Sequence, residues 1–335
     1  MTKAEKIQPD AWRETIARYQ HPDLKRSLWQ LANSVVPFLL LWYLMYRSLE
    51  ASYWLTLALA IPAAGFMART FIIFHDCGHG SFFKSQRAND WTGTLTGILT
   101  FTPYYHWRHN HAIHHASAGN LDRRGVGDVL TLTLEEYRAL PPLKRLGYRI
   151  FRNPVVMFTV GAWGVFILAH RFYGKKSGKR ERFSVQLTNL ALLNIILLLS
   201  LLIGFKAFFL VEFPILVITT GLGVWLFYVQ HNFETTYWER QADWDFASAG
   251  LKGSSFYKLP RVLQWFTGNI GFHHIHHLGP RVPNYYLSKC HSENTIFQQV
   301  KPLTILTSLK SLGYRMWDEE NRRLVGFAAL KTSPT

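Results

Sequence analysis

The sequence predicts an all-α integral membrane protein, with four transmembrane helices in two hairpins and a helical cap on the cytosolic side. Hydrophobic residues make up 48% of the 335-residue chain, yet the mean hydropathy is close to zero. That balance indicates apolar spans joined to a substantial polar part. Four stretches approach the roughly 20 apolar residues that a helix needs to cross a bilayer. The chain shows no convincing run of the alternating pattern typical of strands.

The four apolar stretches are expected to pair into two hairpins, because the turns within each pair are short. The spans cover about residues 31–46, 53–74, 185–203 and 207–229. The cytosolic cap then consists of residues 75–184 and 230–335, and residues 1–335 form a single membrane domain.

Basic residues precede the first and third spans, which places those ends in the cytoplasm by the positive-inside rule. They are Arg13, Arg18, Lys25 and Arg26, followed by Lys175, Lys176, Lys179, Arg180 and Arg182. This placement accounts for most of the net charge of +16 and disfavours nucleic-acid binding.

Three short histidine clusters lie in the expected cap: His75–His79, His106–His115 and His273–His277. The second and third each contain the pattern H-x-x-H-H. Histidines at i, i+3 and i+4 share one helix face, and neutral imidazole is the commonest metal ligand. His231 follows the fourth span as His75 follows the second, so we expect it at the same centre.

Two further apolar stretches, residues 91–105 and 154–169, complicate the count of spans. If both crossed the membrane, the second histidine cluster would face the opposite side from the other two. One metal centre cannot form across a bilayer. We therefore expect both stretches to be half-inserted or interfacial, interrupted as they are by Thr, Gly and Pro.

The clusters supply too many ligands for one zinc ion, which closes with four. The candidates are His75, His79, His111, His114, His115, His231, His273, His276 and His277. Two metals would each receive four or five nitrogens and keep an open position. Iron suits imidazole and changes oxidation state, so the pattern favours an oxygen-reactive pair of irons over a structural or storage zinc site.

Two carboxylates, Asp76 and Glu234, are expected to accept hydrogen bonds from the outer nitrogens of ligand histidines. Three further histidines of the clusters are not needed as ligands and are expected beside the ligands or in solvent: His106, His109 and His274. The isolated His21, His170 and His291 are interpreted as structural or surface residues.

The words HDCGHGSFF, HNHAIHH and GNIGFHHIHHLGPRVPNYYL resemble the three histidine boxes of the integral-membrane acyl-lipid fatty acid desaturases. The stretches AGNLDRRGVGD, WLFYVQHNFE and GSSFYKLP look like the Bacillus-type delta-5 branch of that family. The resemblance extends from about Trp29 to Phe327.

This resemblance implies an enzyme of the bacterial cytoplasmic membrane, with its active site on the cytosolic side. Two iron ions, O2 and two electrons would place a cis double bond, by this likeness at delta-5, in acyl chains of membrane lipids. The resemblance carries the ligand role to the nine histidines, with His231 matching an extra histidine of the animal acyl-CoA branch. That branch has an asparagine where this chain has Phe227, and water could fill the position.

The electron donor has to be a separate protein, because the chain has no dinucleotide fingerprint and only two cysteines. The family suggests ferredoxin or flavodoxin, and an acidic carrier would suit the basic residues Arg123, Arg124, Lys144 and Arg145.

Candidates for the wall of an acyl tunnel are Phe82, Phe83, Trp91, Trp225 and Tyr228. A fatty acid or carotenoid hydroxylase or ketolase on the same scaffold is the alternative. A metal transporter is disfavoured because the histidines lie outside nearly charge-free spans.

Overall fold

The computed structural model describes residues 9–331, and most of them are helical. The helices up to residue 156 are α1 (Pro9–Ala17), α2 (Leu24–Ser48), α3 (Tyr53–His79), α4 (Gln86–Leu99), α5 (Tyr104–Ser117), α6 (Leu134–Ala139), α7 (Pro142–Phe151) and α8 (Pro154–Val156). The later α-helices are α9 (Lys179–Ile203), α10 (Phe205–His231), α11 (Phe246–Lys252), α12 (Arg261–Phe266), α13 (His273–Leu278), α14 (Asn284–Glu293), α15 (Thr295–Gln298) and α16 (Ile305–Ser308).

Short helices of other types and short strands complete the described chain. The π-helices are η1 (Met157–Gly161) and η2 (Gly164–Leu168), and the 3-10 helices are η3 (Ala169–Arg171), η4 (Leu309–Gly313) and η5 (Phe327–Lys331). The strands are β1 (Leu132–Thr133), β2 (Phe256–Tyr257), β3 (Pro302–Leu303), β4 (Met316–Asp318) and β5 (Arg323–Val325). They form one sheet of order β1-β4-β5 and one parallel pair, β2-β3. The sequence did not indicate these strands, because two or three residues are too few to show an alternating pattern.

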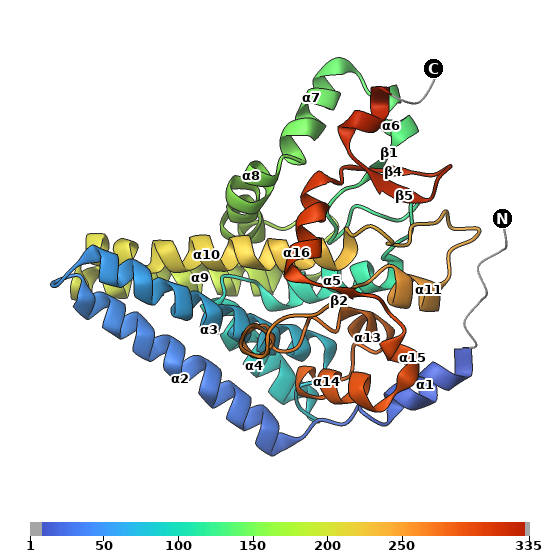
Figure 1. Ribbon diagram of the computed structural model, residues 1–335. Coiled ribbons are helices and arrows are strands. Elements are labelled where there is room, and N and C mark those ends of the chain that lie inside the picture. The colour runs from blue at the N-terminus through green and yellow to red at the C-terminus, as the bar shows by residue number, and fades with distance from the viewer. Residues whose placement is uncertain (1–8, 332–335) are drawn as a thin grey trace.

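Four long helices contain the four expected spans and lie together as α2, α3, α9 and α10. In Figure 1 they extend toward the left of the view, while most of the remaining elements gather on the right. All four are long and apolar enough to cross a membrane, and so is a fifth segment, Pro154–Arg171. Residues 91–105 do not form one helix, because α4 ends at Leu99 and α5 begins at Tyr104.

The long helices pack closely because α3 presents small side chains to its neighbours. Ala60, Ala63 and Ala64 are fully buried against Phe38 of α2 and Ile215 of α10. Small residues of this kind let membrane helices approach one another. The outward faces are apolar instead, and Leu201 of α9 is 85% exposed, which suits contact with lipid.

Two charged residues lie buried within the expected spans 53–74 and 207–229, so these spans are less uniform than the sequence indicated. They are Arg69 of α3 and Glu212 of α10. Glu212 accepts a hydrogen bond of 2.7 Å from the indole nitrogen of Trp42 in α2. Charged groups at membrane depth are costly and often functional.

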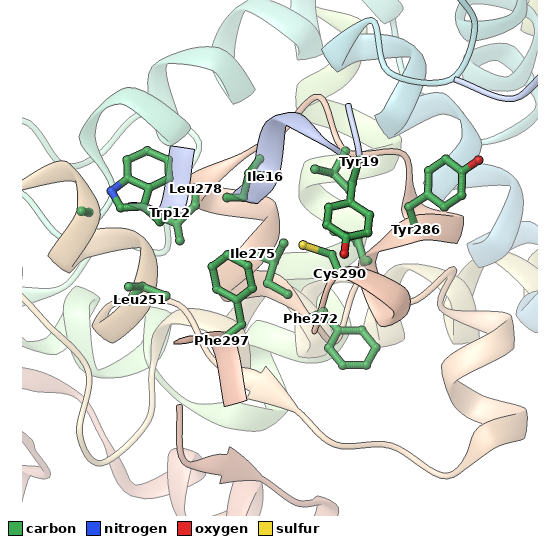
Figure 2. Close-up of a cluster of buried hydrophobic side chains, with 13 residues drawn as sticks. Trp12, Ile16, Tyr19, Leu251, Phe272, Ile275, Leu278, Tyr286, Cys290 and Phe297 are labelled. Carbon is green, nitrogen blue, oxygen red and sulfur yellow. The ribbon is translucent and has the colours of Figure 1, made fainter. Parts of the chain in front are cut away.

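A separate hydrophobic core supports α13, which carries the third histidine cluster. Figure 2 shows Trp12 and Ile16 of α1 with Ile275 and Leu278 of α13 and Cys290 of α14. Ile275 is fully buried in this core. Because Ile275 anchors one side of α13, the histidines on the other side are held in a defined direction.

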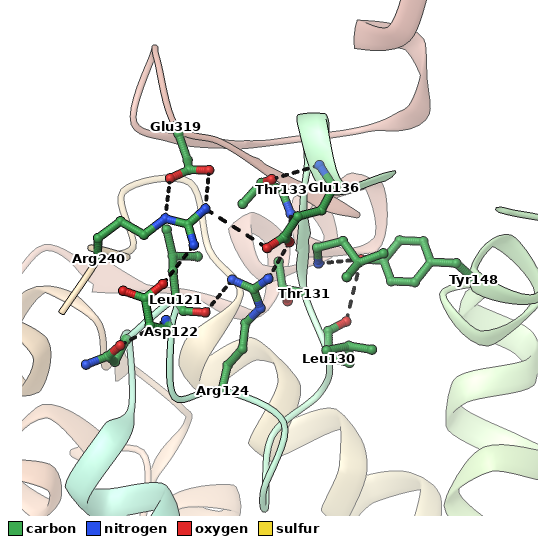
Figure 3. A network of polar contacts seen from close by, with 12 residues as sticks. Leu121, Asp122, Arg124, Leu130, Thr131, Thr133, Glu136, Tyr148, Arg240 and Glu319 are labelled. Carbon is green, nitrogen blue, oxygen red and sulfur yellow. Dashed lines mark hydrogen bonds and ion pairs between the residues drawn. The ribbon is translucent and has the colours of Figure 1, made fainter. Parts of the chain in front are cut away.

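A network of charges fastens the loop after α5 to the C-terminal hairpin (Figure 3). Arg240 donates to both carboxylate oxygens of Glu319 at 2.8 Å and to Asp122 at 2.8 Å. Arg124 of the same loop pairs with Glu136 of α6. Bidentate pairs fix geometry as well as charge, so this network limits movement of the loop beside the histidines.

The close contact of α4 with α5 predicts that Gly93→Ala will destabilise the protein. A Cβ at Gly93 would lie 2.2 Å from Cε2 of Tyr104, a buried ring whose hydroxyl is bonded to the Cys77 carbonyl at 2.7 Å. Because the ring cannot easily move, we expect a loss of about 1–3 kcal/mol. Thermal unfolding in detergent measures this loss. The matched control is Gly147→Ala in α7, where a Cβ meets open space; an equal fall in both melting temperatures would contradict the packing argument.

Candidate metal centre

The histidines come from four helices whose ends meet at one side of the long helices. His75 and His79 lie in the last two turns of α3, which ends because Gly80 adopts a left-handed conformation with φ of 67°. His231 is the last residue of α10. The second cluster lies on α5 and the third on α13.

The structure brings the nine candidate ligands into two compact groups. The five-histidine group contains His75, His79, His111, His115 and His276, and the four-histidine group contains His114, His231, His273 and His277. Within each group the nearest ring nitrogens all lie within 4.8 Å of one another. The two groups adjoin, since the rings of His115 and His277 stack with centroids 4.2 Å apart. Each group is therefore able to hold a metal ion.

Two histidines of the four-histidine group, His114 and His231, make hydrogen bonds on the side of the ring that faces away from the group. These bonds orient the two rings so that their nitrogen lone pairs face one another. His114 uses Nδ1 to contact the carboxylate of Asp128, and His231 uses Nδ1 to contact the Gly253 carbonyl at 3.1 Å. Because both partners only accept, each Nδ1 carries the proton and each Nε2 is left with a lone pair. These two Nε2 atoms lie 3.2 Å apart. Two lone pairs at that distance repel unless a cation lies between them.

The spacing of the nitrogens also fits a metal ion. Ligands about 2.1 Å from one ion, at right angles, are about 3.0 Å apart. The distance between Nε2 atoms is 3.1 Å for His75 and His111, and 3.0 Å for His115 and His276. It is 3.0 Å for His231 and His273. An all-imidazole set of this kind suits iron, copper, nickel or zinc.

Burial keeps the ligand candidates of the cap neutral. Desolvation, and after it repulsion between neighbouring imidazoles, holds their pKa values well below the usual value for histidine. This applies to His111, His115, His273, His276 and His277. Neutral imidazole is the form that binds metal, so these side chains need not lose a proton first.

The carboxylates beside the groups are Asp76 and Asp128. Asp76 lies 3.3 Å from Nδ1 of His75 and accepts two hydrogen bonds from Asn284, as the sequence led us to expect for a neighbour of a ligand. The prediction for Glu234 was wrong, because this side chain is exposed and lies 3.6 Å from the ammonium of Lys310.

Asp128 was missed by the sequence reasoning. Gly127 before it has a φ of 70°, and a Cβ at this position would lie 3.1 Å from the Asn110 carbonyl and 3.1 Å from Cβ of His114. The glycine therefore lets the loop pass close to α5, which brings Asp128 to His114. An acidic residue directly after glycine, downstream of a histidine cluster, was the available signal.

The remaining histidines lie outside both groups. His106 is half-buried with its Nδ1 3.8 Å from Glu181, and His109 is exposed. His274 is buried beside Phe256 and Phe297. The isolated histidines contact other aromatic rings: His21 lies against Tyr286, His170 against Phe166, and His291 against Phe256 and Phe272.

Phe227 lies against the four-histidine group, with its ring centroid 5.0 Å from that of His114 and 5.3 Å from that of His231. A cavity of about 10 Å³ lies beside these three rings and Asp128. That volume is close to the lower limit for one water molecule. A phenyl ring offers no ligand atom, so Phe227 itself supplies no further ligand to this group.

The five aromatic residues expected along an acyl tunnel lie in different settings. Trp91 is 71% exposed, and Phe82 and Phe83 pack in the core around Tyr104. Trp225 donates to the Tyr257 hydroxyl at 3.4 Å. The hydroxyl of Tyr228 bonds to the carbonyls of Ser311 and Tyr314 at 2.9 Å, which fastens α10 to the C-terminal segment.

The long apolar helices and the paired histidine groups together define a membrane-associated, metal-binding class of protein. The family model described as "Fatty acid desaturase" matches residues 52–302. The chain is 50% identical over 319 residues to "Fatty acid desaturase" of Bacillus subtilis, covering 95% of this chain and 91% of that protein. The chain belongs to the fatty acid desaturase family and is an oxidoreductase.

More distant relatives carry more specific names. One is the "sn-1 oleoyl-lipid 12-desaturase" of Synechocystis, which is 29% identical over 66% of this chain and 63% of its own length. Another is the "sn-1 acyl-lipid omega-3 desaturase (ferredoxin)" of the same organism, at 29% identity over 65% of this chain and 61% of its own length. Acyl-lipid desaturases are therefore among its relatives.

Proposed function

We propose that this protein is an O2-dependent desaturase of acyl chains in membrane lipids, and that its histidines bind two iron ions. The observation that carries this proposal is the division of nine buried or half-buried histidines into adjoining groups of five and four. Iron in these groups would supply the oxidation of two adjacent C–H bonds with O2 and two electrons.

The protein's own residues would bind and orient the metals and exclude water. Asp76, Asp128 and the Gly253 carbonyl orient three of the rings from outside. A fixed second layer of this kind raises ligand basicity and metal affinity. The burial of His75, His114 and His276 keeps bulk water away from the reacting carbons.

The arrangement of the segment 154–171 supports four crossings rather than five. Arg152, directly before it, donates to Asn232 just beyond the end of α10. At its other end Arg171 donates to Asn189 at 2.9 Å. Asn189 lies in the first half of α9, the half whose Ser184 accepts from the backbone of His106. Both ends of the segment therefore lie toward the histidine end of the α9–α10 hairpin, while Trp163 in its middle lies against Phe213 of α10, with ring centroids 5.3 Å apart. A segment that enters and returns on the same side supports a half-inserted helix and one domain over residues 1–335.

The positive-inside rule supports an active site on the cytosolic side of a bacterial cytoplasmic membrane. Arg180 and Arg182 open α9 at the histidine end. Arg123 and Lys144 are exposed and available to an acidic electron carrier, whereas Arg124 is already paired with Glu136. We propose ferredoxin or flavodoxin as that carrier, in line with the ferredoxin named in one relative.

The proposal predicts a new double bond when the chain is expressed in a bacterium that lacks desaturases. Derivatised membrane fatty acids are separated by gas chromatography and identified by mass spectrometry. We expect a mono-unsaturated product with its double bond at delta-5, absent from a His114→Ala control. Hydroxy or keto products would favour the hydroxylase or ketolase instead. If iron-loaded protein, supplied with a ferredoxin system, leaves the fatty acids unchanged, acyl chains are not its substrate.

A further inference from the structure

A second cavity, of about 590 Å³, lies outside the two histidine groups but next to one of them. Its lining includes Arg69, Lys258, Arg261, Gln264, Trp265 and Asn284. Asn284 also donates to Asp76 at 2.7 and 2.8 Å, and Asp76 contacts His75 of the five-histidine group. Two residues therefore separate this cavity from the proposed metal site, and its volume is typical of a small-molecule site.

The lining of this cavity is positively charged. It includes Arg69, Lys258 and Arg261, and no Asp or Glu is among the described lining residues. Lys258 and Arg261 are exposed, whereas Arg69 is only 7% exposed. A buried cation without a carboxylate partner is costly unless an anion joins it.

Two hydrogen-bond donors in this cavity have no partner among residues 9–331. Arg69 lies 3.9 Å above the Trp265 ring and donates to the Trp265 carbonyl, but its Nε has no acceptor among the described residues. The side-chain nitrogen of Gln264 is likewise buried and unbonded within the described chain. Unsatisfied buried donors are rare in native proteins, and these two line the same cavity. Both observations indicate an anionic ligand with acceptor oxygens.

The other walls of the cavity are apolar and lie beside an exposed apolar helix. Phe256, Leu259 and Phe272 contribute hydrocarbon and aromatic surface. On α12, which packs on α3 through Phe266, Val262 is exposed next to Arg261. Apolar and aromatic groups beside arginine are typical of the membrane–water interface. A ligand here would combine an anion with hydrocarbon chains.

We propose that this cavity binds the phosphodiester group of a membrane phospholipid, with Arg69 and Gln264 as donors and Lys258 and Arg261 supplying positive charge. This inference rests on the proposed function and names its substrate class. A headgroup held two residues from the five-histidine group would present acyl carbons close to the ester, which suits a double bond near the carboxyl end. The position of the bond would then be counted from the headgroup.

The test is lipid binding, which does not require a working iron centre. Detergent-purified protein is titrated with phosphatidylglycerol and, separately, with a galactosyl diacylglycerol that has the same acyl chains, and bound lipid is counted by native mass spectrometry. We expect tighter binding of the phospholipid. Gln264→Leu and Arg69→Gln should each weaken that binding about tenfold, since a hydrogen bond to a charged group is lost. Lys252→Gln, an exposed cation outside the cavity, should leave it unchanged.

Three results would overturn the assignment. One is equal affinity for the two lipids, and another is unchanged phospholipid binding in Gln264→Leu, which keeps side-chain volume and so tests the site even if Arg69→Gln does not fold. The third is displacement of the phospholipid by an equal concentration of inorganic phosphate, which would identify a free-phosphate site. If the protein binds the phospholipid as expected but forms no double bond, only the proposed desaturation reaction is contradicted, and the lipid site is not.

Discussion

Replacing His276 with alanine is expected to abolish desaturation and to lower the iron content of the purified protein. His276 is 1% exposed and its Nε2 lies 3.0 Å from that of His115. Its ring centroid is also 4.5 Å from that of His75 and 4.9 Å from that of His79. Removing it takes one of five nitrogens from the centre of the group. Loss of a group that only hydrogen-bonds to a ligand histidine lowers metal affinity or activity by about 10–100-fold. Loss of the histidine itself should therefore lower activity by more than about 100-fold.

The matched control is His274→Ala on the same helix. His274 is equally buried but lies outside both groups, against Phe256 and Phe297. Its removal leaves a comparable cavity without removing a proposed ligand. Iron is measured by plasma mass spectrometry and product by gas chromatography. Equal loss of iron in the two variants would mean that α13 matters only through its packing, and full iron retention in His276→Ala would exclude His276 as a ligand.

The candidate ligands could be found from sequence because their spacing is local. Residues at i, i+3 and i+4 lie on one helix face whatever the helix packs against. The division into two groups could not be found in the same way. His114 and His115 are consecutive, yet they belong to different groups. Neighbouring residues point about 100° apart on a helix, and only the packing of α3, α10 and α13 around α5 decides which partner each ring meets.

The carboxylates show where sequence distance misleads. Glu234 follows His231 by three residues, which would place it on the same face if α10 continued. The helix instead ends at His231 and Asn232 leaves it with φ of −114° and ψ of 79°, so Glu234 turns toward Lys310. Asp128 is 14 residues from His114 in an irregular loop. Its approach depends on Gly127 and on the charge network of Arg124 and Arg240, none of which has a periodic signal.

The spans were also predictable in position but not in extent. Apolar content indicates what a bilayer would cover, whereas α3 and α10 continue past the apolar region to His79 and His231. These extensions carry the histidines, and tertiary contacts stabilise them more than propensity does. The role of residues 154–169 depended on the same missing information, because the contacts of Arg152, Trp163 and Arg171 indicate how far that segment reaches.

Asp128→Asn is expected to weaken metal binding by about 10–100-fold while leaving the fold intact. The side chain of Asp128 is 9% exposed and that of His114 is fully buried. The carboxylate accepts from Nδ1 of His114, which holds the ring with Nε2 toward His231 and increases electron density on that nitrogen. An asparagine of the same shape removes the negative charge, and its amide can present a donor to a nitrogen that is itself a donor. His114 would then be a weaker and less well oriented ligand.

The comparison that tests this role is Glu234→Gln, which also neutralises one carboxylate but at the exposed site beside Lys310. Both variants are challenged with a graded series of chelator concentrations, and the iron retained is measured. We expect Asp128→Asn to lose iron at a lower chelator concentration than the wild type, and Glu234→Gln to match the wild type. If the two variants behave alike, the contact between Asp128 and His114 does not tune the metal. Because only tertiary structure distinguishes these two carboxylates, a difference between them would show that the four-histidine group depends on the loop after α5 as well as on the three helices that carry its histidines, α5, α10 and α13.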